Sequence, residues 1–151
     1  MAAWRNYGID TIVSLLTEDE ERQLDLTQES SEARKRGVAF LSYPIPDRGI
    51  PSDTSTFFDL LERIHNSLQQ GNNVLVHCRQ GIGRTGLIAA SLLVRDGLEP
   101  DRAIEQVSKI RGVHVPETAE QESCIYNVPT RTVNRVQHQH GTDLHRIAVG
   151  R

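Results

Sequence analysis

Cysteine is scarce in this chain of 151 residues, which has only Cys78 and Cys124 and no CxxC spacing. Two isolated cysteines argue against a disulfide-stabilised scaffold and against a cysteine-rich zinc site, and they favour a reducing compartment. No apolar run approaches the ~20 residues of a membrane-spanning helix, and the start of the chain lacks the basic and apolar regions of a secretory signal. These absences predict a cytoplasmic protein that has no membrane partner.

A strong excess of one charge is also lacking. The 17 Lys and Arg residues against 20 Asp and Glu residues give a formal net charge of -3. Whole-chain electrostatics therefore predicts no nucleic-acid partner, and any selectivity for an anion must come from a local site. The content of 37% hydrophobic and 25% charged residues is typical of one soluble globular domain.

Segments with the apolar pattern of strands alternate with segments that favour helices. The predicted strands cover residues 8–16, 38–46 and 73–77, and the main predicted helices cover residues 54–70, 87–96, 100–111 and 115–126. This alternation predicts an α/β domain with a central, mostly parallel sheet that helices cover on both faces. Beyond Tyr126 the periodicity fades. We therefore expect a domain over residues 1–127 and a basic, mobile tail over 128–151, in which His138 and His140 are solvated and bind no metal.

The sequence VHCRQGIGRTG, from Val76 to Gly86, places a flexible, glycine-rich loop between two apolar segments. A strand, a glycine-bearing turn and a helix that begins near Arg84 direct successive backbone N–H groups into one concavity, which favours an anion. A GxxxxGK[ST] nucleotide loop needs a lysine before its hydroxyl residue, whereas this loop has Arg84 before Thr85. The loop therefore predicts an anion site of another kind.

Cys78 and Arg84 give this loop its chemistry. Helix N-termini and nearby cations stabilise thiolates, so an ionised Cys78 is expected. The planar guanidinium of Arg84 can bind two oxygens of a phosphate, which the ammonium of a lysine cannot do. Each residue alone fits an inert buried thiol or a surface cation better, but together they predict a nucleophile beside a bound phosphate.

His77, Cys78, five intervening residues, Arg84 and Thr85 form the pattern HCx5R[ST]. Here the sequence resembles the cysteine-based protein tyrosine phosphatase superfamily, and especially its small dual-specificity branch. The resemblance implies that Cys78 accepts the phosphoryl group, that Arg84 binds its oxygens, and that His77 supports the thiolate. It also implies that the Thr85 hydroxyl donates a hydrogen bond to the Cys78 sulfur when this sulfur leaves the phosphoryl group in the second step. The implied phosphate-binding residues are Arg79, Gln80, Gly81, Ile82, Gly83 and Arg84.

Two further segments support this resemblance. YPIPDRGIPSD looks like the general-acid loop of dual-specificity phosphatases, which implies that Asp47 protonates the leaving group; Asp53 fits a helix N-cap better. The pattern PETxEQ is similar to a segment that supports the loop or positions the hydrolytic water, and it nominates Gln121 for water placement. The resemblance extends from about Gly8 to about Ile125. Family domains usually have another strand before this region, so the chain is expected to lack it and to leave a sheet edge exposed.

The predicted function is hydrolysis of phosphotyrosine, and of phosphoserine and phosphothreonine, in a protein or peptide through a phosphocysteine intermediate, without a metal or cofactor. The alternatives are a phosphatase of phosphoinositides or nucleotides and a non-catalytic phosphoprotein-binding module. Sulfur transfer of the rhodanese type and arsenate reduction also use a cysteine in an anion loop, but neither needs Asp47 or the HCx5R[ST] spacing. The sequence leaves the physiological substrate and the oligomeric state open.

Overall fold

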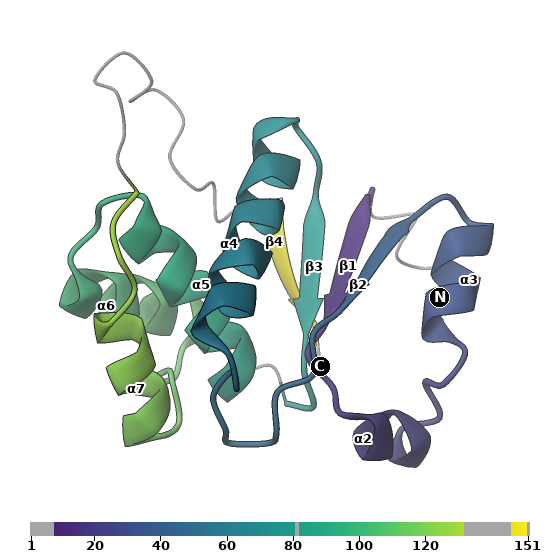
Figure 1. The fold of residues 1–151 in the computed structure, drawn as a ribbon, viewed down its shortest axis with the longest axis horizontal. Helices are drawn as coiled ribbons and strands as arrows, with labels where there is room; N and C mark the ends of the chain where they lie inside the picture. Colours follow the sequence, from purple (N-terminus) through teal and green to yellow (C-terminus); the bar gives the residue numbers. More distant parts are fainter. Residues whose placement is uncertain (1–7, 81, 132–145, 151) are drawn as a thin grey trace.

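A four-stranded parallel sheet forms the centre of the protein in the computed structural model, which describes residues 8–80, 82–131 and 146–150 (Figure 1). Its strands, in the order in which they lie side by side, are β2 (Ala39–Ser42), β1 (Thr11–Ser14), β3 (Val74–His77) and β4 (Ile147–Gly150). The helices are α2 (Glu18–Gln23), α3 (Glu29–Lys35), α4 (Thr54–Gln69), α5 (Gly83–Arg95), α6 (Pro100–Arg111) and α7 (Ala119–Tyr126). The predicted α/β class is confirmed.

All strand pairs are parallel, so the strands end at the same edge of the sheet. Ser14 at the end of β1 lies opposite both Ser42 of β2 and His77 of β3. The segments that follow β1, β2 and β3 are therefore brought together at this edge, although they lie far apart in the sequence. In open parallel sheets this carboxyl edge is where ligands usually bind.

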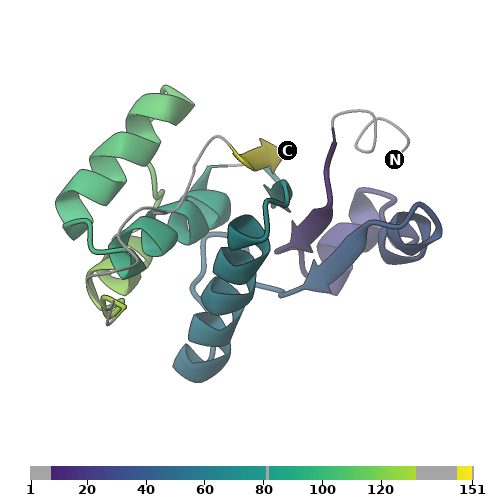
Figure 2. The same ribbon diagram turned by 90° about the horizontal axis from the view of Figure 1, so that it is seen from above.

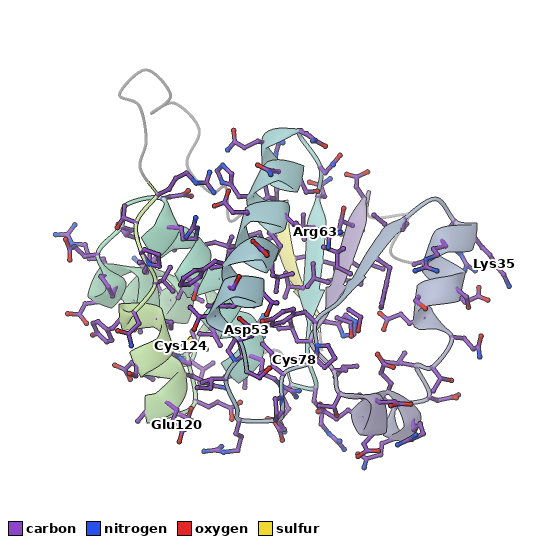
Figure 3. The ribbon with its side chains drawn as sticks, viewed as in Figure 1. Lys35, Asp53, Arg63, Cys78, Glu120 and Cys124 are labelled. Atoms are coloured by element: carbon purple, nitrogen blue, oxygen red, sulfur yellow. The ribbon has the colours of Figure 1, made fainter. Side chains whose placement is uncertain are left out.

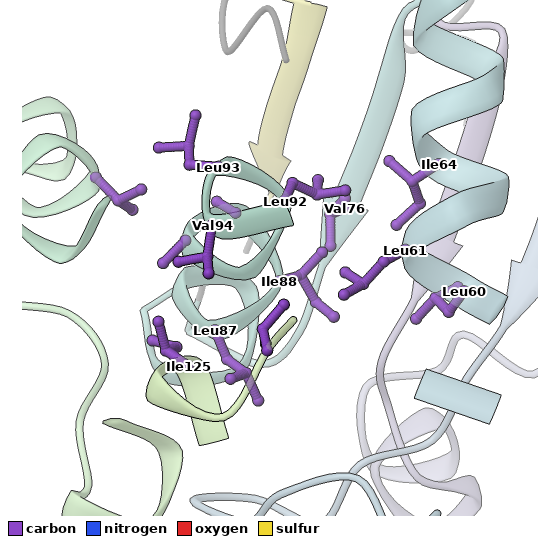
Figure 4. Packing of buried hydrophobic residues seen from close by; sticks show 14 of the residues in the cluster. Leu60, Leu61, Ile64, Val76, Leu87, Ile88, Leu92, Leu93, Val94 and Ile125 are labelled. Carbon is purple, nitrogen blue, oxygen red and sulfur yellow. The ribbon is translucent and has the colours of Figure 1, made fainter. Parts of the chain in front are cut away.

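The larger hydrophobic core lies between one face of the sheet and helices α4 and α5. Figure 4 shows Leu61 and Ile64 of α4 close to Val76 of β3 and to Ile88 of α5. Helix α5 is apolar on nearly every side, because α6 and α7 cover the part of its surface that faces away from the sheet. Asp53 caps α4 by accepting hydrogen bonds from the backbone N–H groups of residues 55 and 56, as its position before the apolar pattern predicts.

The opposite face of the sheet carries a smaller core. Ile12 of β1 and Leu75 of β3 pack there against Ala33 of α3. Because neighbouring residues of a strand point to opposite faces, Val74 and Val76 join the larger core while Leu75 joins the smaller one. Both faces therefore carry helices, and α2 and α3 lie on the side away from α4–α7 (Figure 2).

The structure corrects the prediction for the last residues of the chain. Residues 147–150 form β4, which pairs with β3, instead of belonging to a mobile tail. Their four-residue sequence IAVG follows a long polar segment and is too short for a periodic signal, so only the unpaired edge of β3 identifies it as a strand. Among the described residues no strand precedes β1. His138 and His140 lie outside the described residues.

Helix α7 begins at Ala119 rather than at Val115. Helix α5 begins at Gly83, close to the start that the loop predicts near Arg84, although its apolar pattern begins only at Leu87. The glycines and polar residues of the segment 83–86 conceal the first turn of this helix from an analysis of apolar periodicity. No helix in the described parts of the chain is both long enough and apolar enough to cross a lipid bilayer.

We expect removal of residues 146–151 to lower the free energy of unfolding by about 2 kcal/mol or more, because the backbone groups along the edge of β3 lose their partners. Urea unfolding followed by far-ultraviolet circular dichroism measures this loss. The substitution Gln106→Ala on the exposed side of α6 serves as a control. An unchanged unfolding midpoint in the truncated protein would show that β4 adds nothing to the sheet.

Candidate active site

Cys78 lies directly after β3, at the carboxyl edge of the sheet (Figure 3). The strand is completely buried and the Cys78 side chain is 2% exposed, so the position of the sulfur is fixed by the core on which it rests. Thr85 in the first turn of α5 is equally buried, and its hydroxyl oxygen lies 3.9 Å from the Cys78 Sγ atom. This is within hydrogen-bond distance for sulfur.

The thirteen-residue helix α5 begins beside this sulfur, and no side chain caps its N-terminus. The first backbone N–H groups of a helix have no partners within the helix, and the helix dipole adds positive potential at this end. Together they form a site for an anion next to Cys78. The turn 79–82 completes the loop; of the predicted phosphate-binding residues in it, Gly81 lies outside the described residues.

Arg84 is buried, with 2% of its surface exposed, and Glu20 of α2 holds its guanidinium group. The Glu20 Oε1 and Oε2 atoms accept hydrogen bonds from Nη1 and Nη2 at 2.6 and 2.8 Å, which is the parallel geometry that Arg and carboxylate groups prefer. Nη1 also donates to the backbone oxygen of Ile45 at 2.8 Å. The hydrogen bond from Arg84 lowers the pKa of Glu20 to about 2, against the opposing effect of burial, so Glu20 is ionised at neutral pH.

Asp47 approaches the same guanidinium group from the loop after β2. Its Oδ1 atom lies 3.4 Å from the Arg84 Nη2 atom, and its side chain is 64% exposed. Arg84 lies in the first turn of α5, which begins beside Cys78. Nucleophile, arginine and predicted acid therefore come together at one edge of the sheet, although they belong to separate segments of the sequence.

His77 does not point toward solvent. It is 3% exposed, and its Nε2 atom lies 2.7 Å from Oε1 of Glu29, a buried residue of α3. This contact links α3 to β3, the strand that ends directly before Cys78. His77 thus lies beneath the loop, where it connects β3 to α3.

The remaining predicted residues have different surroundings. Arg79 and Gln80 are exposed, and Arg79 donates a hydrogen bond to Gln23 of α2 at 2.7 Å. Gln121 is completely buried and both polar atoms of its side chain contact backbone groups of neighbouring segments. Cys124 lies one helical turn further along α7, where burial raises the pKa of its thiol.

The glycines of the loop make room for a neighbouring segment. A Cβ atom at Gly86 would lie 2.8 Å from the Cβ atom of Val115, and one at Gly83 would lie 3.1 Å from the Oε1 atom of Gln121. Both contacts are too short for a side chain without movement of the neighbour. Gly83 and Gly86 therefore allow the residues after α6 to pack against the first turns of α5.

Two residues of the site, Glu20 and Glu29, are missed by the sequence analysis, because they lie in charged segments without a distinctive motif for a catalytic site. A signal for Glu20 exists in the pattern Thr17-x-x-Glu20, a capping box in which both residues bond to each other's backbone N–H groups. This cap turns the Glu20 carboxylate back toward the start of α2, where Arg84 reaches it. Among the described residues, no group of three or more His, Cys, Asp or Glu side chains is arranged to hold a metal ion.

Comparison with known proteins gives a consistent result. Residues 1–98 match the family model of a polymorphic toxin system DSP-PTPase phosphatase. Mouse cyclin-dependent kinase inhibitor 3 is 27% identical over 123 residues, which cover 81% of this chain and 58% of that protein. The chain spans 43–58% of the length of the cyclin-dependent kinase inhibitor 3 proteins that it matches.

Solved structures share the fold. Kinase associated phosphatase, crystallised with its catalytic-site cysteine replaced by serine, has a TM-score of 0.78 and 25% identity, with coverage of 83% of this chain and 71% of that one. The active form of Tk-PTP has a TM-score of 0.71 and 31% identity, with coverage of 81% and 79%.

We expect Glu20→Gln to lower the free energy of unfolding at pH 7 by about 2–4 kcal/mol, because it leaves the buried Arg84 without its counter-charge. The pKa of Glu20 is lower in the folded protein than its ordinary value of 4.5. Its stabilising contribution is therefore complete above about pH 4.5 and is lost as the pH falls toward 2.

Urea unfolding of wild type and Glu20→Gln at pH 7 and at about pH 3.5 tests this linkage, and the stability gap should be smaller at the lower pH. Glu18→Gln is the matched control, because Glu18 lies on the same helix with its side chain 84% exposed. A gap that stays constant with pH would contradict an ionised Glu20 that is held by Arg84.

Proposed function

Because the chain belongs to the DSP-PTPase phosphatase family of polymorphic toxin systems, we propose that it hydrolyses phosphorylated tyrosine, and also phosphorylated serine and threonine, in protein substrates through a phosphocysteine intermediate. The observation that carries this proposal is the meeting of Cys78, Arg84 and Asp47 at the N-terminus of α5. Each supplies one requirement of the reaction: a nucleophile, a ligand for the phosphoryl oxygens and an acid.

In the first step the Cys78 thiolate attacks the phosphorus atom. A new S–P bond forms while the P–O bond to the leaving group breaks, and Asp47 transfers its proton to the leaving oxygen. The oxygens of the phosphoryl group carry negative charge throughout. The guanidinium of Arg84 and the backbone N–H groups at the start of α5 stabilise this charge, because they are fixed before the substrate binds.

In the second step water attacks the phosphocysteine. The S–P bond breaks, Asp47 takes one proton from the water, and inorganic phosphate leaves. The sulfur departs as a thiolate, and the Thr85 hydroxyl, 3.9 Å away, donates a hydrogen bond that stabilises its charge. The cycle returns both Cys78 and Asp47 to their starting states without a metal or cofactor.

The relatives support this assignment. Kinase associated phosphatase was crystallised with its catalytic-site cysteine replaced by serine. We assign the role of catalytic cysteine in this chain to Cys78. Asp47 is largely exposed, so the proposed acid lies near the surface and not at the bottom of a deep cleft. This supports phosphoserine and phosphothreonine, whose side chains are short, as further substrates. Since a thiolate nucleophile is easily oxidised, the proposal includes a reducing cytoplasmic compartment.

A non-catalytic phosphoprotein-binding module would need only the anion site. It would not need an acid directed at the same guanidinium group or a hydroxyl beside the sulfur. The presence of Asp47 and Thr85 at these positions therefore favours the enzyme over the binding module.

We expect wild-type protein to hydrolyse an aryl phosphate in the presence of EDTA. Cys78→Ser should lower kcat by about 10⁴-fold or more, since it removes the nucleophile. Labelled phosphate should become attached to wild-type protein in an acid-quenched reaction and not to Cys78→Ser. Cys124→Ser is the matched control; activity that survives in Cys78→Ser would contradict the phosphocysteine mechanism.

We expect Asp47→Asn to lower kcat/KM by about 10²–10⁴-fold for phosphoesters whose leaving group needs a proton. The alkaline fall of the wild-type rate should disappear in this variant, because it reports the loss of the Asp47 proton. Asp59→Asn on the exposed surface of α4 serves as the control. Unchanged pH profiles and rates in Asp47→Asn would remove Asp47 as the acid.

A further inference from the structure

Residues 117–121, which end the connection after α6 and begin α7, contact both the turn with Asp47 and the start of α5. From these contacts we propose that Gln121 is a positioning residue for the general acid: it fixes the turn that carries Asp47 relative to the phosphate-binding end of α5. This inference rests on the proposed function, because it assigns Gln121 a part in the protonation of the leaving group.

Asp47 occupies a tight turn. The Gly49 N–H group donates a hydrogen bond to the Pro46 backbone oxygen at 2.7 Å, and Arg48 has a φ of 60°, in the left-handed region. A Cβ atom at Gly49 would lie 2.9 Å from the Pro46 backbone oxygen, so the turn is closed by a residue without a side chain. A movement of Gly49 is therefore transmitted directly to Asp47.

Gln121 holds this turn at Gly49. Its Nε2 atom donates a hydrogen bond to the Gly49 backbone oxygen at 3.0 Å, across 72 positions of the sequence. Its Oε1 atom accepts a hydrogen bond from the Glu117 backbone N–H group at 3.1 Å. The side chain is 0% exposed, so loss of either partner would leave a buried polar group unpaired.

These two partners determine the orientation of the carboxamide. A backbone oxygen requires a donor and a backbone N–H group requires an acceptor, so the amide nitrogen must face Gly49 and the amide oxygen must face Glu117. The backbone N–H group of Gln121 is fixed as well, because it donates to the side chain of the cap residue Thr118. Gln121 is thus held rigidly before it acts on the turn.

The same segment rests on the phosphate site. A Cβ atom at Gly83, the first residue of α5, would lie 3.1 Å from the Gln121 Oε1 atom and 3.2 Å from the Glu117 Cδ atom. Arg48, the neighbour of Asp47, adds a second contact between the turn and this segment: an ion pair with Glu117 at 3.1 Å. Because the Arg48 side chain is 63% exposed, this ion pair contributes less than the buried amide does.

A positioning role has a distinct kinetic signature. Proton donation matters most for a leaving group of high basicity and little for an activated one. A displaced Asp47 therefore slows the hydrolysis of a phenyl or alkyl phosphate and spares that of a nitrophenyl phosphate. Placement of the hydrolytic water, the role implied by the family resemblance, would instead slow the second step, which is the same for every ester.

The test compares both kinds of ester in wild type and Gln121→Met, a variant of similar length that lacks the two hydrogen bonds. We expect kcat/KM for the phenyl ester to fall by about 10–100-fold and that for the nitrophenyl ester to change by less than about threefold. In an Asp47→Asn background the same substitution should cause no further loss, because the acid is already absent. Gln106→Met on the exposed side of α6 is the matched control.

Glu117→Gln keeps the buried amide contacts and removes only the charge that faces Arg48, so it tests the proposal even if Gln121→Met folds poorly. We expect the same selectivity between esters with a smaller loss, of about threefold for the phenyl ester. An equal loss of kcat for both esters, with kcat/KM unchanged and phosphocysteine accumulating, would show that Gln121 places water. Equal losses without accumulation, or no loss, would also overturn the positioning role. Wild-type protein that hydrolyses neither ester would overturn the proposed function itself.

Discussion

The buried ion pair between Arg84 and Glu20 is the constraint on which the rest of the site depends. A guanidinium group that is 2% exposed cannot remain without a counter-charge, and Glu20 supplies it through two hydrogen bonds. The geometry of these two hydrogen bonds fixes the position of α2, which carries Glu20, relative to the first turn of α5. The arginine is therefore in place before any phosphate arrives, so its orientation requires no reorganisation during the reaction.

Two carboxylates approach this guanidinium group, and their surroundings give them different parts. Glu20 is buried, accepts hydrogen bonds from Arg84 and Thr17, and has its pKa lowered to about 2. Such a group cannot donate a proton at neutral pH. Asp47 is largely exposed and lies at 3.4 Å from a single Nη2 atom, so it is bound far less tightly. This difference favours Asp47 over Glu20 as the proposed acid.

The sequence is most informative where local chemistry determines structure. The loop with Cys78 and Arg84, the cap at Asp53 and the segment with Asp47 can all be singled out in the sequence, because each depends on residue types within a short segment. Glu20 and Glu29 are not predicted, since their roles arise from contacts across 64 and 48 positions. Strand β4 is missed for the same reason: its four residues become a strand only because the edge of β3 is available.

The acid loop is held at both of its ends, and this arrangement links its position to that of the phosphate. On the N-terminal side the Ile45 backbone oxygen accepts a hydrogen bond from Arg84, the proposed ligand of the phosphoryl group. On the C-terminal side the Gly49 backbone oxygen accepts one from Gln121, which rests on the first residue of α5. Both hydrogen bonds thus fix the position of Asp47 relative to helix α5. Because that helix also carries the anion-binding N–H groups, acid and phosphate share one rigid frame, and an exposed loop can hold a proton donor in a defined position.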